Sequence, residues 1–134
     1  MNHQVFVYGT LRKGGTNHHL LRDAELQAVV KLKGFEMWDF GSYPGVTSSE
    51  NDDDTIEAEF YSVDDETLAF LDRLEDFYGE NHPRNLYDRD LIQDDFGHKG
   101  WIYVFRRQLL SLPFFKKRSR KVISGVWNKF NYSD

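Results

Sequence analysis

Short stretches in which apolar and polar residues alternate are the feature that most constrains the fold of this chain. The clearest is TIEAEFYSV at residues 55–63, where Ile56, Ala58 and Phe60 alternate with polar side chains, as in a half-buried β-strand. Strand-like runs recur at residues 4–8, 24–33, 35–38, 86–92 and 101–107, and a short final strand or closing segment is expected at 122–130. The pattern predicts an α+β fold, a small mixed β-barrel or strongly curled sheet of about six to seven strands with two main helices.

The strongest helix signal lies at residues 64–79, DDETLAFLDRLEDFYG. Asp64 occupies an N-cap position, acidic residues fill the first turn, and Gly79 is a natural stop. Residues 16–23 are expected to form one or two helical turns. Loops are predicted at residues 41–46, 48–54 and 80–85, and an irregular, proline-interrupted segment at 109–121.

Composition narrows the class of protein. A length of 134 residues suits one domain, residues 1–134, and 16% aromatic residues indicate a folded globular chain. The chain has no cysteine, which excludes disulfides, thiol nucleophiles and cysteine-based zinc sites. A net charge of −5 argues against general nucleic-acid affinity. No apolar run of about 20 residues and no signal peptide is visible, so a soluble, cytoplasmic protein without membrane contact is expected.

One carboxylate of the predicted helix falls on its apolar side. On a helical wheel Glu75 lies within the stripe formed by Leu68 and Leu71, near the C-terminal end of the helix. Burial and the negative end of the helix dipole both disfavour ionisation, so the pattern predicts a raised pKa and a group able to exchange protons near neutral pH. The alternative is a peripheral carboxylate that pairs with Arg or Lys or reaches water.

The N-terminal stretch VFVYGTLRKGGTNHHLL, residues 5–21, changes from strand to turn at Gly9. A strand followed by a glycine turn leaves backbone N–H groups without partners, and such a concave group of amides binds carboxylate or phosphate. The stretch matches neither the Walker A loop nor GxGxxG. An ordinary glycine turn is the commoner explanation of such a stretch taken alone, and an anion site is the second interpretation.

Taken together, these features resemble the γ-glutamylcyclotransferase-like family, which includes γ-glutamylamine cyclotransferases and YtfP-type bacterial proteins. The resemblance spans nearly the whole chain, and its order and spacing make it specific. It is carried by VFVYGTLRKGGTNHHLL, GSYPGV, IEAEFYSVDDETLAFLDRLED, LYDRDLI, WIYVFRR and ISGVW.

The resemblance implies a reaction on a small γ-glutamyl substrate. The α-amine of the substrate attacks its own γ-carbonyl and releases 5-oxoproline and a free amine, so the enzyme supplies no nucleophile, metal or cofactor. The family's helix glutamate matches Glu75, which would serve as general base and acid. The family's loop matches Tyr8, Gly9, Thr10 and Leu11, which would hold the α-carboxylate.

The same resemblance marks Tyr87 and Arg89 in the YxR block as further candidates for the substrate pocket. Tyr87 could line the pocket, and Arg89 could pair with an acidic neighbour. A tyrosine in the core of the strand and a surface arginine are equally open interpretations. The chain departs from the family at Ala58, where Gly is frequent, and at Val126, where the closing motif carries Asp. These departures leave the identity of the leaving amine open.

A basic segment, residues 116–121, places five positive charges beside Phe114 and Phe115. It is compatible with a solvated loop, with nucleic acid or with another acidic partner. A non-catalytic relative that binds through this segment is therefore the alternative function. The five histidines show no metal-ligand spacing. The sequence leaves the oligomeric state open.

Overall fold

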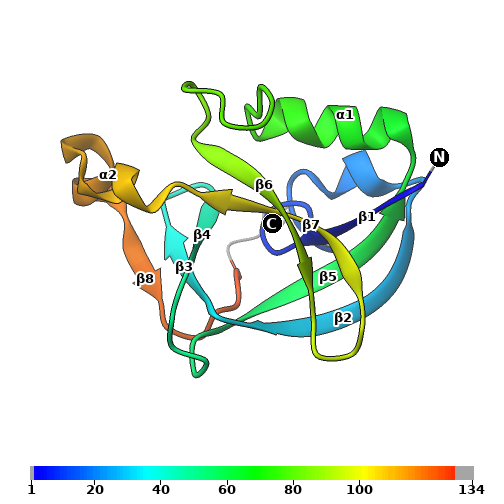
Figure 1. Ribbon diagram of the computed structural model, residues 1–134, viewed down its shortest axis with the longest axis horizontal. Coiled ribbons are helices and arrows are strands. Elements are labelled where there is room, and N and C mark those ends of the chain that lie inside the picture. The colour runs from blue at the N-terminus through cyan, green and yellow to red at the C-terminus, as the bar shows by residue number, and fades with distance from the viewer. Residues whose placement is uncertain (1, 129–134) are drawn as a thin grey trace, which may run out of the picture.

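The computed structural model describes residues 2–128, and within them the chain forms an α+β fold of two curled sheets and two α-helices (Figure 1). The fold class expected from the sequence is thereby confirmed. None of the helices in residues 2–128 is long and apolar enough to cross a membrane. The assignment of residues 1–134 to one domain stays a prediction.

The larger sheet has five strands in the order β2-β5-β1-β7-β6. Only β1 and β7 run parallel; the other neighbours are antiparallel. Its strands are β1 (His3–Val7), β2 (Glu25–Lys33), β5 (Thr55–Val63), β6 (Tyr87–Gln93) and β7 (Lys99–Phe105). All five lie close to the predicted runs, because each run has the strand period and ends at turn residues.

The smaller sheet has the order β4-β3-β8 and contains β3 (Phe35–Asp39), β4 (Pro44–Ser48) and β8 (Arg120–Val122). The prediction that residues 41–46 form only a loop is wrong, because Pro44 begins a strand that pairs with β3. β4 is an edge strand, where proline at the first position is tolerated. The expected final strand also begins earlier and ends at Val122, and residues 129 and 130 of that prediction lie outside the described part.

Helix α1 (Asp65–Leu74) begins as predicted, with the Asp64 side chain accepting a hydrogen bond from the Thr67 amide at 2.7 Å. It ends earlier than Gly79, and this part of the prediction is wrong. Asp76 adopts a left-handed conformation with φ of 50°, which aspartate tolerates better than most residues and which stops the helix. The amide of Phe77 then bonds to the Asp72 carbonyl at 2.8 Å.

The remaining helical segments are short. The turns expected at residues 16–23 form a 3₁₀ helix at His18–Leu21. The segment expected to be irregular contains a 3₁₀ helix at Arg107–Ser111 and helix α2 (Pro113–Arg118), which has proline in its first turn, where its missing N–H is harmless. Figure 1 shows α2 at the opposite side of the molecule from α1.

The central strands β1 and β5 bury both of their faces. In β1, Val5 and Val7 join the apolar cluster that contains Leu71 of α1, whereas Phe6 joins a second cluster on the other face with Trp127. Two clusters that share a central strand hold its carboxyl end rigidly. The chain leaves this strand at Tyr8 and Gly9, where the cavity described below opens.

Candidate active site

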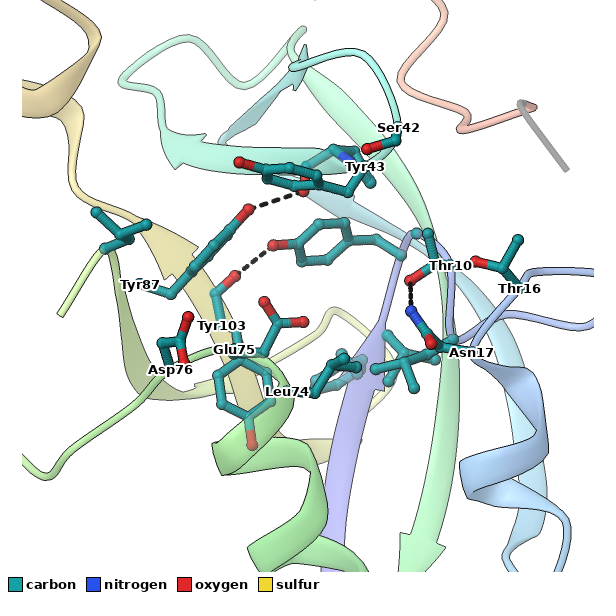
Figure 2. Close-up of a pocket in the computed structure, with 17 residues that line it drawn as sticks. Thr10, Thr16, Asn17, Ser42, Tyr43, Leu74, Glu75, Asp76, Tyr87 and Tyr103 are labelled. Carbon is teal, nitrogen blue, oxygen red and sulfur yellow. Dashed lines mark hydrogen bonds between the residues drawn. The ribbon is translucent and has the colours of Figure 1, made fainter. Parts of the chain in front are cut away.

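A cavity of about 500 Å³ opens where β1 ends, between the following turn, the C-terminal end of α1 and strands β6 and β7 (Figure 2). This volume lies within the range of about 300–1,000 Å³ common for small-molecule sites. The residues that line it are Phe6, Val7, Tyr8, Gly9, Thr10, Leu11, Thr16, Asn17, Ser42, Tyr43, Pro44, Leu74, Glu75, Asp76, Leu86, Tyr87 and Tyr103.

Most residues proposed from the sequence meet in this one cavity. Glu75 faces the turn that contains Tyr8, Gly9, Thr10 and Leu11, although more than 60 positions separate them in the chain. Tyr87 also contributes to the wall. The structure therefore places in one cavity the two halves of the candidate site, which the family resemblance had joined.

The turn after β1 is closed by its own carbonyl groups. The Arg12 amide donates to the Gly9 carbonyl at 3.0 Å, and the Asn17 amide donates to the Thr10 carbonyl at 2.9 Å. The Asn17 side chain also donates to the Thr10 hydroxyl at 3.0 Å. Within residues 2–128, none of the turn's hydrogen bonds uses the amides of Gly9, Thr10 or Leu11. All three residues line the cavity, and amides without a protein acceptor can bind an anion.

Gly9 is required by a close approach. A Cβ atom at this position would lie 2.5 Å from Cγ of Pro44, closer than side chains come to one another. The absence of a side chain lets the turn contact the start of β4, which carries Pro44 into the cavity wall. The glycine thus positions the turn, and its φ is not in the left-handed region.

A buried carboxylate of β5, which the sequence analysis did not identify, holds the turn in place by a hydrogen bond. Glu59 of β5 is 7% exposed and accepts hydrogen bonds from the Lys13 amide at 2.9 Å and the Tyr61 hydroxyl at 2.8 Å. Arg12, also buried, donates to the Trp127 carbonyl. Little in the sequence signalled this role, because Glu59 occupies one of the polar positions that alternate with Ile56, Ala58 and Phe60 along the strand.

Glu75 lies at the C-cap of α1, one residue beyond the helix in which the sequence had placed it. Its amide still bonds to the Leu71 carbonyl at 3.0 Å, so the side chain keeps the direction that the helical wheel predicts. Burial, and then the neighbouring charge of Asp76, raise the pKa of Glu75 from 4.5 to about 7. The group is therefore poised to gain or lose a proton near neutral pH.

Two tyrosines whose hydroxyl groups already donate hydrogen bonds to backbone carbonyls face this carboxylate. The Tyr8 hydroxyl donates to the Tyr103 carbonyl at 2.7 Å, and the Tyr87 hydroxyl donates to the Pro44 carbonyl at 3.0 Å (Figure 2). Burial raises the pKa of both phenols well above 10, with a further contribution from the charge of Glu75. Both remain neutral, and their rings tie the cavity wall to β4 and β7.

Arg89 is not among the residues that line the cavity. Its guanidinium bonds to both oxygens of Asp72 at 2.9 and 2.8 Å, and it lies 4.6 Å from the ring centre of Trp101. The Tyr103 hydroxyl donates to the same carboxylate at 2.6 Å. Arg89 therefore pairs with an acidic neighbour, the role suggested for it from the sequence, and it fixes the last turn of α1 just before Glu75.

Several lining residues were missed by sequence reasoning, namely Thr16, Asn17, Ser42, Asp76 and Tyr103. Thr16, Asn17, Ser42 and Asp76 lie outside the strands and α-helices, where no periodic pattern predicts orientation, whereas Tyr103 lies within β7. Within residues 2–128, no group of three or more His, Asp or Glu side chains is arranged to hold a metal ion. The basic segment 116–121 contributes no residue to the cavity wall.

Comparison with known proteins shows which family the chain resembles. Residues 5–129 match the family described as gamma-glutamyl cyclotransferase, AIG2-like. The chain is 35% identical over 124 residues to the γ-glutamylcyclotransferase family protein YtfP of Escherichia coli strain K12, covering 92% of this chain and 95% of that protein. It is 37% identical over 107 residues to the γ-L-glutamyl-butirosin B γ-glutamyl cyclotransferase of Niallia circulans, covering 77% and 67%.

The solution structure of ytfP from Escherichia coli has the same architecture, with a TM-score of 0.64 at 29% identity, covering 94% of this chain and 96% of that chain. The similarity therefore extends over the sheet, the turn and the helix that build the cavity. The protein belongs to the γ-glutamyl cyclotransferase, AIG2-like family.

Proposed function

We propose that this protein is an enzyme that converts a γ-glutamyl amine or peptide into 5-oxoproline and a free amine. The observation that supports this most is the position of Glu75, a carboxyl group with a pKa of about 7, across one cavity from three available amides. Family membership supports the same reaction.

The amides of Gly9, Thr10 and Leu11 would bind the α-carboxylate of the substrate, since these residues line the cavity and, within residues 2–128, their amides donate to no protein acceptor. Binding there would fold the glutamyl chain so that its α-amine approaches its γ-carbonyl. Holding two reacting groups together replaces a bimolecular step by an intramolecular one.

Glu75 would then carry the proton. Its carboxylate takes a proton from the α-ammonium, and the freed nitrogen lone pair forms a C–N bond to the γ-carbonyl carbon. Glu75 passes this proton to the nitrogen of the leaving amine, and the original amide C–N bond breaks. The ring nitrogen gives up its second proton through Glu75 to the released amine, which leaves as an ammonium ion, so that the neutral ring amide of 5-oxoproline and a regenerated carboxylate remain. One placed acid-base group of this kind contributes about 10²–10⁴-fold to a rate.

The test measures by chromatography whether the protein releases 5-oxoproline from γ-glutamyl amines and γ-glutamyl dipeptides. The Glu75→Gln variant should lose at least about 100-fold in kcat, because glutamine cannot exchange the proton. Glu66→Gln, an exposed position at the start of α1, is the matched control and should retain full activity. Undiminished activity in Glu75→Gln would refute the mechanism.

The alternative function, binding through residues 116–121, stays a prediction. Phe114 is 56% exposed, and Lys116, Lys117 and Arg118 are exposed beside it. Neutralising these three cations should abolish any salt-sensitive binding to nucleic acid or to an acidic protein. Binding that persists in that variant would remove the alternative.

A further inference from the structure

The cavity has an unbalanced charge. Among the described residues that line it, two are acidic, Glu75 and Asp76, and none is Lys, Arg or His. A substrate of the proposed reaction carries one carboxylate and one ammonium on its glutamyl part. The rest of the substrate is the leaving amine, and it occupies the part of the cavity that the glutamyl group does not fill. The charges in that part of the cavity therefore select the charge of the leaving amine.

The two sides of the cavity differ in the groups they offer. Figure 2 shows Thr10, Thr16 and Asn17 on one side of Glu75, and Asp76 with Tyr87 on the other. The first side offers backbone amides and hydroxyl groups, which suit a carboxylate. The glutamyl α-carboxylate is therefore expected there, and the leaving amine extends toward Asp76.

On the side of Asp76, two side chains offer hydrogen-bond acceptors to the cavity. The Tyr87 hydroxyl gives its proton to the Pro44 carbonyl at 3.0 Å, so its oxygen offers only lone pairs to the cavity. The Asp76 carboxylate is exposed, and within residues 2–128 it takes part in no hydrogen bond or ion pair. Leu86 supplies an apolar surface beside these two groups.

From this arrangement we infer that the enzyme selects γ-glutamyl amides whose leaving part carries a second, protonated amine, with Asp76 as the residue that recognises it. This inference rests on the proposed cyclotransferase function and names its substrate class. An ammonium group there meets a carboxylate and a phenol oxygen that both accept. A leaving group that ends in a carboxylate, as in a γ-glutamyl amino acid, meets the negative charges of Glu75 and Asp76, and no Lys, Arg or His among the described lining residues balances them.

Three substrates isolate the charge. They are γ-glutamyl amides with the same alkyl spacer, which ends in an ammonium, a methyl or a carboxylate group. Release of 5-oxoproline should be fastest for the ammonium substrate, with kcat/KM about tenfold above the methyl substrate, and slowest for the carboxylate substrate. High salt should reduce the difference, because the site is open to solvent.

The variant Asp76→Asn tests the assigned residue. Asparagine tolerates the left-handed backbone at this position, so the turn should keep its shape. The ratio of kcat/KM between the ammonium and methyl substrates should fall from about tenfold to about twofold. This ratio cancels any change in the pKa of Glu75, which affects both substrates equally. Glu80→Gln, an exposed acid outside the cavity wall, is the matched control and should keep the wild-type ratio.

The outcomes separate the inference from the function on which it rests. If none of the three substrates releases 5-oxoproline, the proposed function fails and the inference fails with it. Equal rates for the three substrates, or a faster carboxylate substrate, leave the function intact and overturn the charge selection. An unchanged ratio in Asp76→Asn overturns the assignment to that residue.

Discussion

The site glutamate should make the free protein less stable at neutral pH than it would be without the charge. Burial and the charge of Asp76 raise the pKa of Glu75 to about 7 in the folded state, against 4.5 when unperturbed. The folded protein therefore holds this proton more tightly than the unfolded chain, and stability falls as pH rises from about 4.5 to about 7. Below that window both states are protonated; above it the loss is complete.

The magnitude follows from the size of the shift. A difference between 4.5 and about 7 corresponds to an upper limit of about 3 kcal/mol of unfolding free energy. The cavity admits water to the side chain, so a realistic value is about 1–2 kcal/mol. Glu75→Gln removes the charge with little change in shape. The variant should exceed the wild type in stability by about this amount at pH 8 and match it at pH 4.

Urea denaturation at a series of pH values measures this difference directly. Glu66→Gln, whose side chain is exposed, serves as the control and should follow the wild type at every pH. The reasoning would be refuted if the difference in unfolding free energy between Glu75→Gln and the wild type did not change with pH. Such a result would show that no ionisation is linked to folding at this position.

Three further results are expected. With an active substrate, kcat/KM should rise with pH with a midpoint near 7 as Glu75 loses its proton; a flat pH-rate profile contradicts its role as base. Gly9→Ala should lower the unfolding free energy by about 1–3 kcal/mol in thermal melts, since the new methyl lies 2.5 Å from Pro44 Cγ; unchanged melting contradicts the contact. Glu59→Met leaves the Lys13 amide without its acceptor and should cost about 1–3 kcal/mol; faster hydrogen exchange at that amide is the direct readout, and unchanged exchange rules out the anchoring role.

Local patterns were enough to predict most of the secondary structure. The strands at residues 55–63 and 24–33 were found because their apolar residues have the period of a strand, and the start of α1 was found because Asp64 caps it. The patterns failed at Pro44, where a strand begins with a loop-forming residue, and after Leu74, where Asp76 ends the helix. Neither residue carries a local signal for what it does.

The candidate site also has parts that the sequence predicted and parts that it did not. The wheel position of Glu75 and the turn at Gly9 could be read from the chain, and the family resemblance joined them into one hypothesis. The anchor formed by Glu59 and the acceptor-rich side at Asp76 could not be read, because each depends on contacts between distant segments.

The sequence by itself determined the fold class, the family and the two candidate halves of the site, since these follow from periodicity, turn residues and ordered motifs along the chain. Only the tertiary structure decided that Glu75 lies across a cavity from the Gly9–Leu11 amides with a pKa near 7, and that Arg89 pairs with Asp72 away from the cavity wall. The physical reason is that burial and the neighbouring charge act through space. The groups that set the proton affinity of a carboxylate are those packed around it, whatever their distance along the chain.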